Sequence, residues 1–226
     1  MSTVLSFPEK GGHGRPFFLA SFFLLAVTFS TTGFAQFSNT AAKPDVKVDD
    51  RWLYRRSDHR FEPPVLLYEL RVTFVDQRAI HTVLARQGRP RDSDAIWTPE
   101  WNPVTSVDDG VLEIKAGLLQ FPLTAGGDYG AQWDMRRPRA GSFHARHSRS
   151  VKVLGWELIE VPAGKFNALK VVAEGTWQRL DGKRKASGWA RNTIWYAPEV
   201  KRWVKTLYED AQGKVGEELV FYVVTP

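Results

Sequence analysis

Apolar and polar residues alternate along several stretches of this chain. Residues 68–74 read YELRVTF, residues 169–178 read LKVVAEGTWQ and residues 219–224 read LVFYVV, so apolar side chains recur at about every second position. Successive side chains of a β-strand point to opposite faces, and Val, Tyr, Phe and Trp are favoured there. These stretches are therefore predicted to be strands.

Turn-forming residues separate the alternating stretches. They occur as Asp109-Gly110, Pro162-Ala163-Gly164, Asp181-Gly182 and Gln212-Gly213. Glycine accepts the positive φ of a tight turn, so these positions predict hairpins. The last three runs of the chain, 189–196, 203–209 and 217–224, are then expected to be consecutive antiparallel neighbours. No stretch of twelve residues shows a helical i, i+3, i+4, i+7 pattern. The prediction is a predominantly all-β fold, a curled antiparallel sheet with few or no helices.

The N-terminal segment has the pattern of an export signal. Residues 17–29 (FFLASFFLLAVTF) are apolar, Lys10 and Arg15 precede them, and small residues follow at Gly33 and Ala35. A membrane anchor would need about 20 apolar residues, and the polar residues from Ser30 on interrupt the run too early. We expect residues 1–35 to be a Sec-type signal peptide cleaved after Ala35, with no transmembrane span afterwards and a periplasmic or secreted location.

The rest of the chain is expected to form one domain behind a short leader. Residues 36–50 (QFSNTAAKPDVKVDD) are polar and aperiodic, which predicts a flexible leader, and residues 51–226 form a single β domain. Within that domain, residues 86–108 contain three prolines and no clear period. They are expected to be a long loop, and loops of this length are usually functional.

Composition narrows the chemistry. The 226 residues are 43% hydrophobic and 25% charged, as in ordinary globular proteins, and 31 Lys and Arg against 25 Asp and Glu give a net charge of +6. There is no cysteine. Disulfides, thiol nucleophiles, iron–sulfur clusters and cysteine-bound zinc are therefore excluded, and no cofactor is expected.

Three motifs suggest a family. The chain reads EVPAGKFNALKV over 160–171 and TIWYAPEVKRWVK over 193–205, after Phe121-Pro122-Leu123, Gly126 and Trp133. From about residue 51 to its C-terminus the chain resembles a family of uncharacterised exported bacterial proteins, defined as a domain of unknown function. The resemblance implies a half-barrel like those of the LolA-like and LolB-like periplasmic lipoprotein carriers, which hold acyl chains on a concave face. It implies no catalytic residues.

Residues that would carry out a reaction are hard to find. His144 and His147 are three apart, but a metal site needs three or four converging ligands, and no third ligand is close in the sequence. Nucleophile and metalloprotease motifs are absent, and Asp108-Asp109 precedes a predicted turn. A distant carboxylate pair such as Glu157 with Glu174 stays open. The chain is expected not to be an enzyme.

A basic run and three tryptophans are the candidate binding residues. The run from 136 to 152 has no acid and contains Arg136, Arg137, Arg139, Arg146, Arg149 and Lys152. Clustered arginines pair with phosphate or carboxylate, although a solvated surface is the simpler explanation. Trp97 and Trp101 flank Pro99 in the predicted loop and are expected to cover the entrance of a groove; Trp133 is the third candidate.

The function expected from these features is non-enzymatic. A periplasmic protein would bind an apolar or amphiphilic ligand, such as a lipid or other anionic amphiphile, on the concave face of its sheet. Arg136, Arg137 and Arg139 would hold an anionic head group. The alternative is an envelope assembly module that docks a protein or cell-wall polymer, and an envelope hydrolase comes third. The export signal argues against a nucleic-acid partner.

Overall fold

The computed structural model describes residues 39–58, 65–88, 93–105, 111–137, 143–182 and 186–226. The chain divides into two units, and all described residues belong to the second, Phe37–Pro226. The predicted signal peptide (1–35), Asp108, Asp109 and Arg139 lie outside the described residues.

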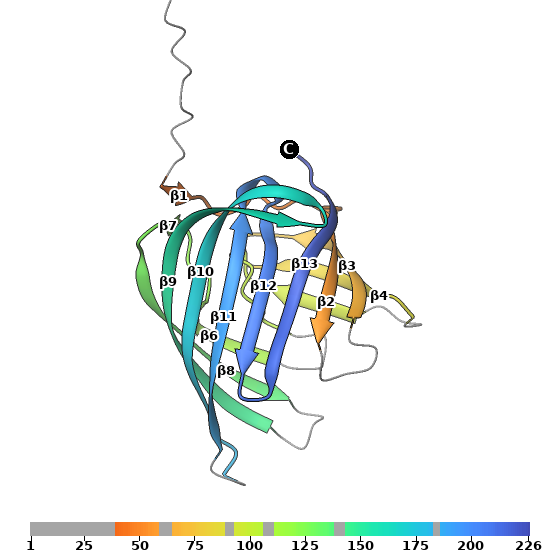
Figure 1. The fold of residues 1–226 in the computed structure, drawn as a ribbon. Helices are drawn as coiled ribbons and strands as arrows, with labels where there is room; N and C mark the ends of the chain where they lie inside the picture. The colour runs from red at the N-terminus through yellow and green to blue at the C-terminus, as the bar shows by residue number, and fades with distance from the viewer. Residues whose placement is uncertain (1–38, 59–64, 89–92, 106–110, 138–142, 183–185) are drawn as a thin grey trace, which may run out of the picture. The chain divides into compact units, whose positions relative to one another are not determined.

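The described residues form strands and one short 3-10 turn, as the alternation predicts (Figure 1). The elements are β1 (Thr40–Ala41), β2 (Arg51–Asp58), β3 (Val65–Val75), β4 (Ile80–Arg86), β5 (Ser93–Trp97), β6 (Val111–Ala116), β7 (Leu123–Thr124), β8 (Asp128–Arg137), β9 (Phe143–Val161), β10 (Gly164–Arg179), β11 (Ser187–Ala197), η1 (Pro198–Val200), β12 (Arg202–Asp210) and β13 (Gly213–Val223). The all-β prediction is confirmed.

Eleven strands make one antiparallel sheet in the order β5-β4-β3-β2-β13-β12-β11-β10-β9-β8-β6. The predicted turns at Pro162-Ala163 and Gln212 connect β9 to β10 and β12 to β13, and Pro198 follows the end of β11. The predicted succession of β11, β12 and β13 as neighbours is also confirmed. Of the eleven strands, β2 comes first in the sequence and β13 comes last, and these two strands pair with each other.

The sheet is curled but not closed. Arg56 of β2 and Trp133 of β8 line the same pocket, although β13, β12, β11, β10 and β9 separate them in the sheet. Five strand pairs contain a register shift, and extra residues of this kind bend a strand and increase its twist; the shifts lie at Val72/Phe74, Ile114/Ala116, Lys170/Val171, Trp195/Tyr196 and Leu219/Phe221. Isolated bridges connect residues 103–105 to the end strands β5 and β6.

The concave face holds the core, whereas charged side chains cover much of the convex face. Trp52, Leu70 and Leu219 are fully buried. On the outside, Glu218 of β13 pairs with Arg55 of β2 at 2.7 Å and with Lys205 of β12 at 2.9 Å. These ion pairs lie on the solvent-facing side of the sheet, opposite the buried core residues.

Two segments differ from their sequence-based expectations. The expected leader is packed in its described part, because Ala41 of β1 pairs with Leu123 of β7 and Val46 is buried. Asp50 is fully buried, and its carboxylate accepts a hydrogen bond from the backbone N–H of Thr225 at 2.7 Å. A two-residue strand is too short to produce an alternation, which is why the sequence gives no sign of it.

The long-loop prediction for 86–108 is wrong for residues 93–97. These form β5, which pairs with β4 through Ile80 opposite Trp97. Five residues at the end of a sheet carry little periodic signal. Among the described residues, no helix has the length and apolar character needed to cross a membrane.

Candidate functional site

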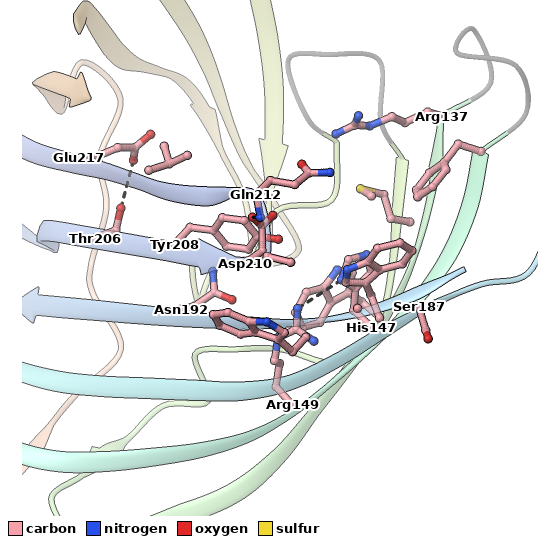
Figure 2. A pocket seen from close by; sticks show the side chains of 18 of the residues that line it. Arg137, His147, Arg149, Ser187, Asn192, Thr206, Tyr208, Asp210, Gln212 and Glu217 are labelled. Atoms are coloured by element: carbon pink, nitrogen blue, oxygen red, sulfur yellow. Dashed lines mark hydrogen bonds between the residues drawn. The ribbon is translucent and has the colours of Figure 1, made fainter. Parts of the chain in front are cut away.

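The interior of the curled sheet contains a pocket of about 1160 Å³ (Figure 2). Seven strands contribute to it: β2, β8, β9, β10, β11, β12 and β13, together with the turn between β12 and β13. Its aromatic and apolar lining consists of Trp133, Met135, Phe143, Trp177, Trp189, Tyr208 and Val215, and its charged lining of Arg56, Arg137, Arg149, Asp210 and Glu217. We call this space the outer pocket.

Strand parity explains which residues of the basic run face the outer pocket. Trp133, Met135 and Arg137 are two residues apart on β8 and all line the pocket, whereas Arg136 points to the other face. On β9, His147 pairs with Trp133, and Arg149 shares its face. The alternation therefore divides the basic run, so that part of it enters the pocket.

Glycines on the neighbouring strands make room for these side chains. A Cβ on Gly188 would lie 2.7 Å from the indole Nε1 of Trp177, so only glycine leaves that ring its place against β11. A Cβ on Gly175 would lie 2.1 Å from the carbonyl oxygen of Ser148, next to Arg149. The close approach of β9 and β10 at this level thus depends on a missing side chain.

Trp133, His147 and Arg149 form a stack on one wall of the pocket. The rings of Trp133 and His147 are nearly parallel, with centroids 5.0 Å apart and 6° between planes. The guanidinium of Arg149 lies 5.4 Å from the Trp133 ring centre, within the range of a cation–π contact. Burial, followed by the charge of Arg149, lowers the pKa of His147 to about 4. The imidazole is therefore neutral at pH 7.

The Arg149 side chain is held by backbone carbonyl groups. It is only 4% exposed, and its Nη1 donates to the carbonyl oxygens of Ser148 at 2.9 Å and of Thr176 at 2.6 Å. Its Nη2 lies 3.5 Å from Nδ1 of His147. Burial lowers the pKa of Arg149 below the usual arginine value. These contacts fix the position of the guanidinium without neutralising its charge.

A second, smaller cavity of about 180 Å³ continues from the outer pocket. The two cavities share Asn192, Thr206, Tyr208 and Glu217. The remaining walls of the smaller cavity are mostly apolar: Trp97, Trp101, Pro103, Leu118, Leu119, Ile194, Trp203 and Leu207. We call this cavity the inner chamber.

The boundary between the two cavities is polar and internally paired. Glu217 contacts Arg56 at 3.2 Å and accepts a hydrogen bond from the hydroxyl of Thr206 at 3.4 Å, as Figure 2 shows for the second contact. Burial, followed by the negative charge of Glu217, raises the pKa of Tyr68. A ligand crossing this boundary would thus meet a carboxylate that already has partners.

Behind the inner chamber lies a buried arginine enclosed by aromatic rings. The Arg202 side chain is 1% exposed, and burial lowers its pKa. Its guanidinium carbon lies 3.8 to 5.6 Å from five ring centres, those of Trp52, Tyr54, Trp97, Trp101 and Trp203. Within the described residues, its Nε and Nη1 have no hydrogen-bond partner. This aromatic cluster closes the far end of the concave space.

The structure separates the predicted site residues. Trp133 and Arg137 line the outer pocket, and Trp97 and Trp101 line the inner chamber. Trp101 is 1% exposed, and its indole N–H donates to the carbonyl of Lys201 at 2.9 Å, so this ring belongs to the closed end of the concave space. Arg136 is exposed on the opposite face of β8.

Several pocket residues go beyond the sequence-based prediction. Arg149 belongs to the predicted basic run and His147 is a candidate only as a metal ligand, whereas no sequence motif marks Trp177, Asn192, Tyr208 or Glu217 as pocket residues. Strand parity with Trp133 would have indicated His147 and Arg149 once the pairing of β8 with β9 was known. Among the described residues, no group of three or more His, Asp and Glu side chains is placed to hold a metal ion.

Comparisons with known proteins support the fold. No protein-family model and no curated protein matches the chain. A candidate lipoprotein from Parabacteroides distasonis has a similar structure with a TM-score of 0.54 and 14% identity, covering 80% of this chain and 98% of its own. A candidate exported protein with a YmcC-like fold from Bacteroides fragilis has a TM-score of 0.49 and 14% identity, covering 81% and 99%. The first likeness shows a shared fold.

Proposed function

We propose that this protein is a non-enzymatic binding protein of the bacterial envelope that holds an apolar or amphiphilic ligand inside its curled sheet. The outer pocket carries the proposal. Its volume of about 1160 Å³ and its aromatic side chains suit an organic ligand, and its polar and charged lining residues suit a ligand that also has a polar or charged part. The inner chamber extends the space with three further indole rings.

An envelope location rests on the N-terminal sequence and on the fold. The apolar run 17–29 between basic and small residues is typical of a signal peptide. The structural neighbour from Parabacteroides distasonis is described as a candidate lipoprotein. Both observations favour an exported protein that meets lipids or other amphiphiles.

The placement of the candidate residues suggests how a bound ligand would be oriented. Trp97 and Trp101 at the inner chamber would contact the apolar end, and Trp133 would contact the middle of the ligand. Arg137, the last residue of β8, lines the outer pocket and would attract the charged group of the ligand. Arg136, on the opposite face, is proposed only as a contributor to the positive field.

A pair of neighbouring residues on β11 gives the most direct test. Asn192 lies at the boundary of the two cavities, whereas Arg191 is exposed on the convex side, where it pairs with Glu174 at 2.8 Å. Asn192→Trp fills the passage, so uptake of a fluorescent fatty acid should fall at least tenfold, while Arg191→Trp should bind like the wild type. Native mass spectrometry of the wild type should show an adduct of lipid-like mass. Absence of both saturable binding and an adduct would contradict the proposal.

A further inference from the structure

Three buried nitrogen atoms on one wall of the outer pocket have no hydrogen-bond partner within the described residues. They are Nε of Arg137, Nε2 of His147 and Nε of Arg149. All three residues line the outer pocket and come from the neighbouring strands β8 and β9. We call this set the donor wall. Buried polar groups are normally hydrogen-bonded, so three exceptions on one wall point to an absent partner.

All three nitrogens are hydrogen-bond donors. Arginine has no acceptor atoms. His147 is neutral and has one N–H, and its Nδ1 faces Nη2 of Arg149 at 3.5 Å, which can only donate. Nδ1 therefore accepts, and Nε2 carries the proton. A partner for this wall must consist of acceptor oxygens.

The donor wall also has an uncompensated positive charge. In the described part of the chain, no carboxylate lies within ion-pair distance of Arg149, which is 4% exposed. Of the two acids in the pocket lining, Glu217 pairs with Arg56 at 3.2 Å, and Asp210 accepts from the backbone N–H of Gln212 at 2.8 Å. A buried cation is costly unless it is paired, so an anion would stabilise this wall.

We infer that the donor wall recognises the anionic group of the ligand, a carboxylate or a phosphate, and that the apolar part of the ligand extends from there into the inner chamber. This inference rests on the proposed function. The three nitrogens are shielded from solvent in this conformation, so ligand binding would require a rearrangement of side chains, a common event at binding sites; Arg137, which is less buried than Arg149, can rearrange most readily. Charge-assisted hydrogen bonds to guanidinium groups are among the strongest available for such recognition.

The strand register supports this orientation. Arg149 lies opposite Gly175, which lies opposite Ala190 on β11. Asn192, at the entrance of the inner chamber, is two residues further along β11. Arg149 and the entrance of the apolar chamber are therefore about 7 Å apart along the strand direction and two strand spacings, about 10 Å, apart across the sheet.

Competition with amphiphiles of equal chain length tests the inference. The neutral dye N-phenyl-1-naphthylamine fluoresces in apolar sites and would report occupancy of the pocket. For the wild type, dodecanoate or dodecyl phosphate should displace it at least tenfold better than dodecanol, because only the anions pair with the donor wall. The stronger of the two anions identifies the head group. Inorganic phosphate alone should not displace the dye. If it displaces the dye at the concentration that is effective for dodecyl phosphate, the inference that the apolar part of the ligand extends into the inner chamber is overturned.

Adjacent residues of β8 give matched variants. Arg137→Gln and Arg149→Gln should each reduce the preference for the anion over dodecanol by about tenfold. Arg136→Gln, on the opposite face, should leave this preference unchanged. Arg137 is less buried than Arg149, so its variant remains informative if Arg149→Gln does not fold.

The outcomes separate the two proposals. If the dye binds but dodecanol competes as well as both anions, anion recognition is overturned and the apolar binding function stands. If Arg137→Gln and Arg149→Gln both fold and keep the wild-type preference, the donor wall is likewise not the anion site. If neither the dye nor any amphiphile binds, the proposed function fails, and this inference fails with it.

Discussion

The guanidinium carbon of Arg202 lies 3.8 Å from the ring centre of Trp203, its neighbour on β12. Its charge is buried at the closed end of the concave space. Among the described residues, aromatic rings rather than a carboxylate surround it. Stacking suits the flat, weakly hydrated guanidinium far better than an ammonium group. The pair explains how a cation can be part of the core.

Two substitutions of Arg202 should separate the contribution of its apolar contacts to stability from the contribution of its charge. Arg202→Met keeps the apolar contacts and removes the buried charge, so it should change the free energy of unfolding by less than about 2 kcal/mol. Arg202→Lys keeps a charge that is harder to desolvate, and should be less stable than Arg202→Met by about 2 kcal/mol. Urea denaturation of the three proteins measures both differences. If the lysine variant is the more stable one, cation–π attraction dominates and the explanation is wrong.

Gly175→Ala should strongly destabilise the sheet. The new Cβ would lie 2.1 Å from the carbonyl oxygen of Ser148 and 3.0 Å from Cα of Arg149, both backbone atoms that cannot rotate away. We expect a loss of about 3 kcal/mol or more in the free energy of unfolding. Gly130→Ala on β8 is the control, because nothing lies within 4 Å of its Cβ position. Equal stability of the two variants would contradict the close approach of β9 and β10.

The turns were predictable because each depends on two or three adjacent residues. Pro162-Ala163-Gly164 has the backbone preferences of a turn whatever surrounds it, and Gly164 has a φ of 132°. Strands such as β3 and β10 were predictable because one solvated and one buried face produce alternation. A curled sheet was predicted, but the places where the strands bend were not. The bends depend on β-bulges, and a one-residue shift in a short alternating pattern is too weak a signal to locate them.

The site was only partly predictable because its residues are distant in the sequence. Trp52, Trp101 and Trp203 meet in one cluster, with a ring distance of 5.3 Å between the first two. Nothing in a single sequence pairs residues so far apart. The basic run was recognisable, but dividing it into the inward Arg149 and the outward Arg136 required the register of β8 and β9.

Trp101 should be essential for stability, whereas a tryptophan on the surface should not. The Trp101 ring packs edge-on against Trp52 at 5.3 Å and Trp97 at 5.8 Å, and is 1% exposed. Trp101→Ala should therefore cost about 3 to 5 kcal/mol in the free energy of unfolding. Trp189, 51% exposed, is the control, and Trp189→Ala should cost less than about 1 kcal/mol. Similar losses would show that Trp101 is not a core residue.

Stability should fall with acidity through His147. Burial and the nearby charge of Arg149 lower the pKa of His147 from 6.5 to about 4, with Asp134 opposing and Arg137 adding to the shift. Between these two values the unfolded chain binds a proton that the folded protein does not. The contribution of His147 is therefore fully present above about pH 6.5 and is lost as the pH falls towards 4.

A neutral replacement isolates this effect from other titrating groups. His147→Gln removes the ionisation, so the stability difference between wild type and variant should shift against the wild type by about 2 kcal/mol from pH 7 to pH 4, after allowance for the partial exposure of the ring. Urea denaturation at both pH values gives the four free energies needed. The same difference at both pH values would mean that His147 titrates normally, and that its ring is not held in the stack with Trp133 beside the guanidinium of Arg149.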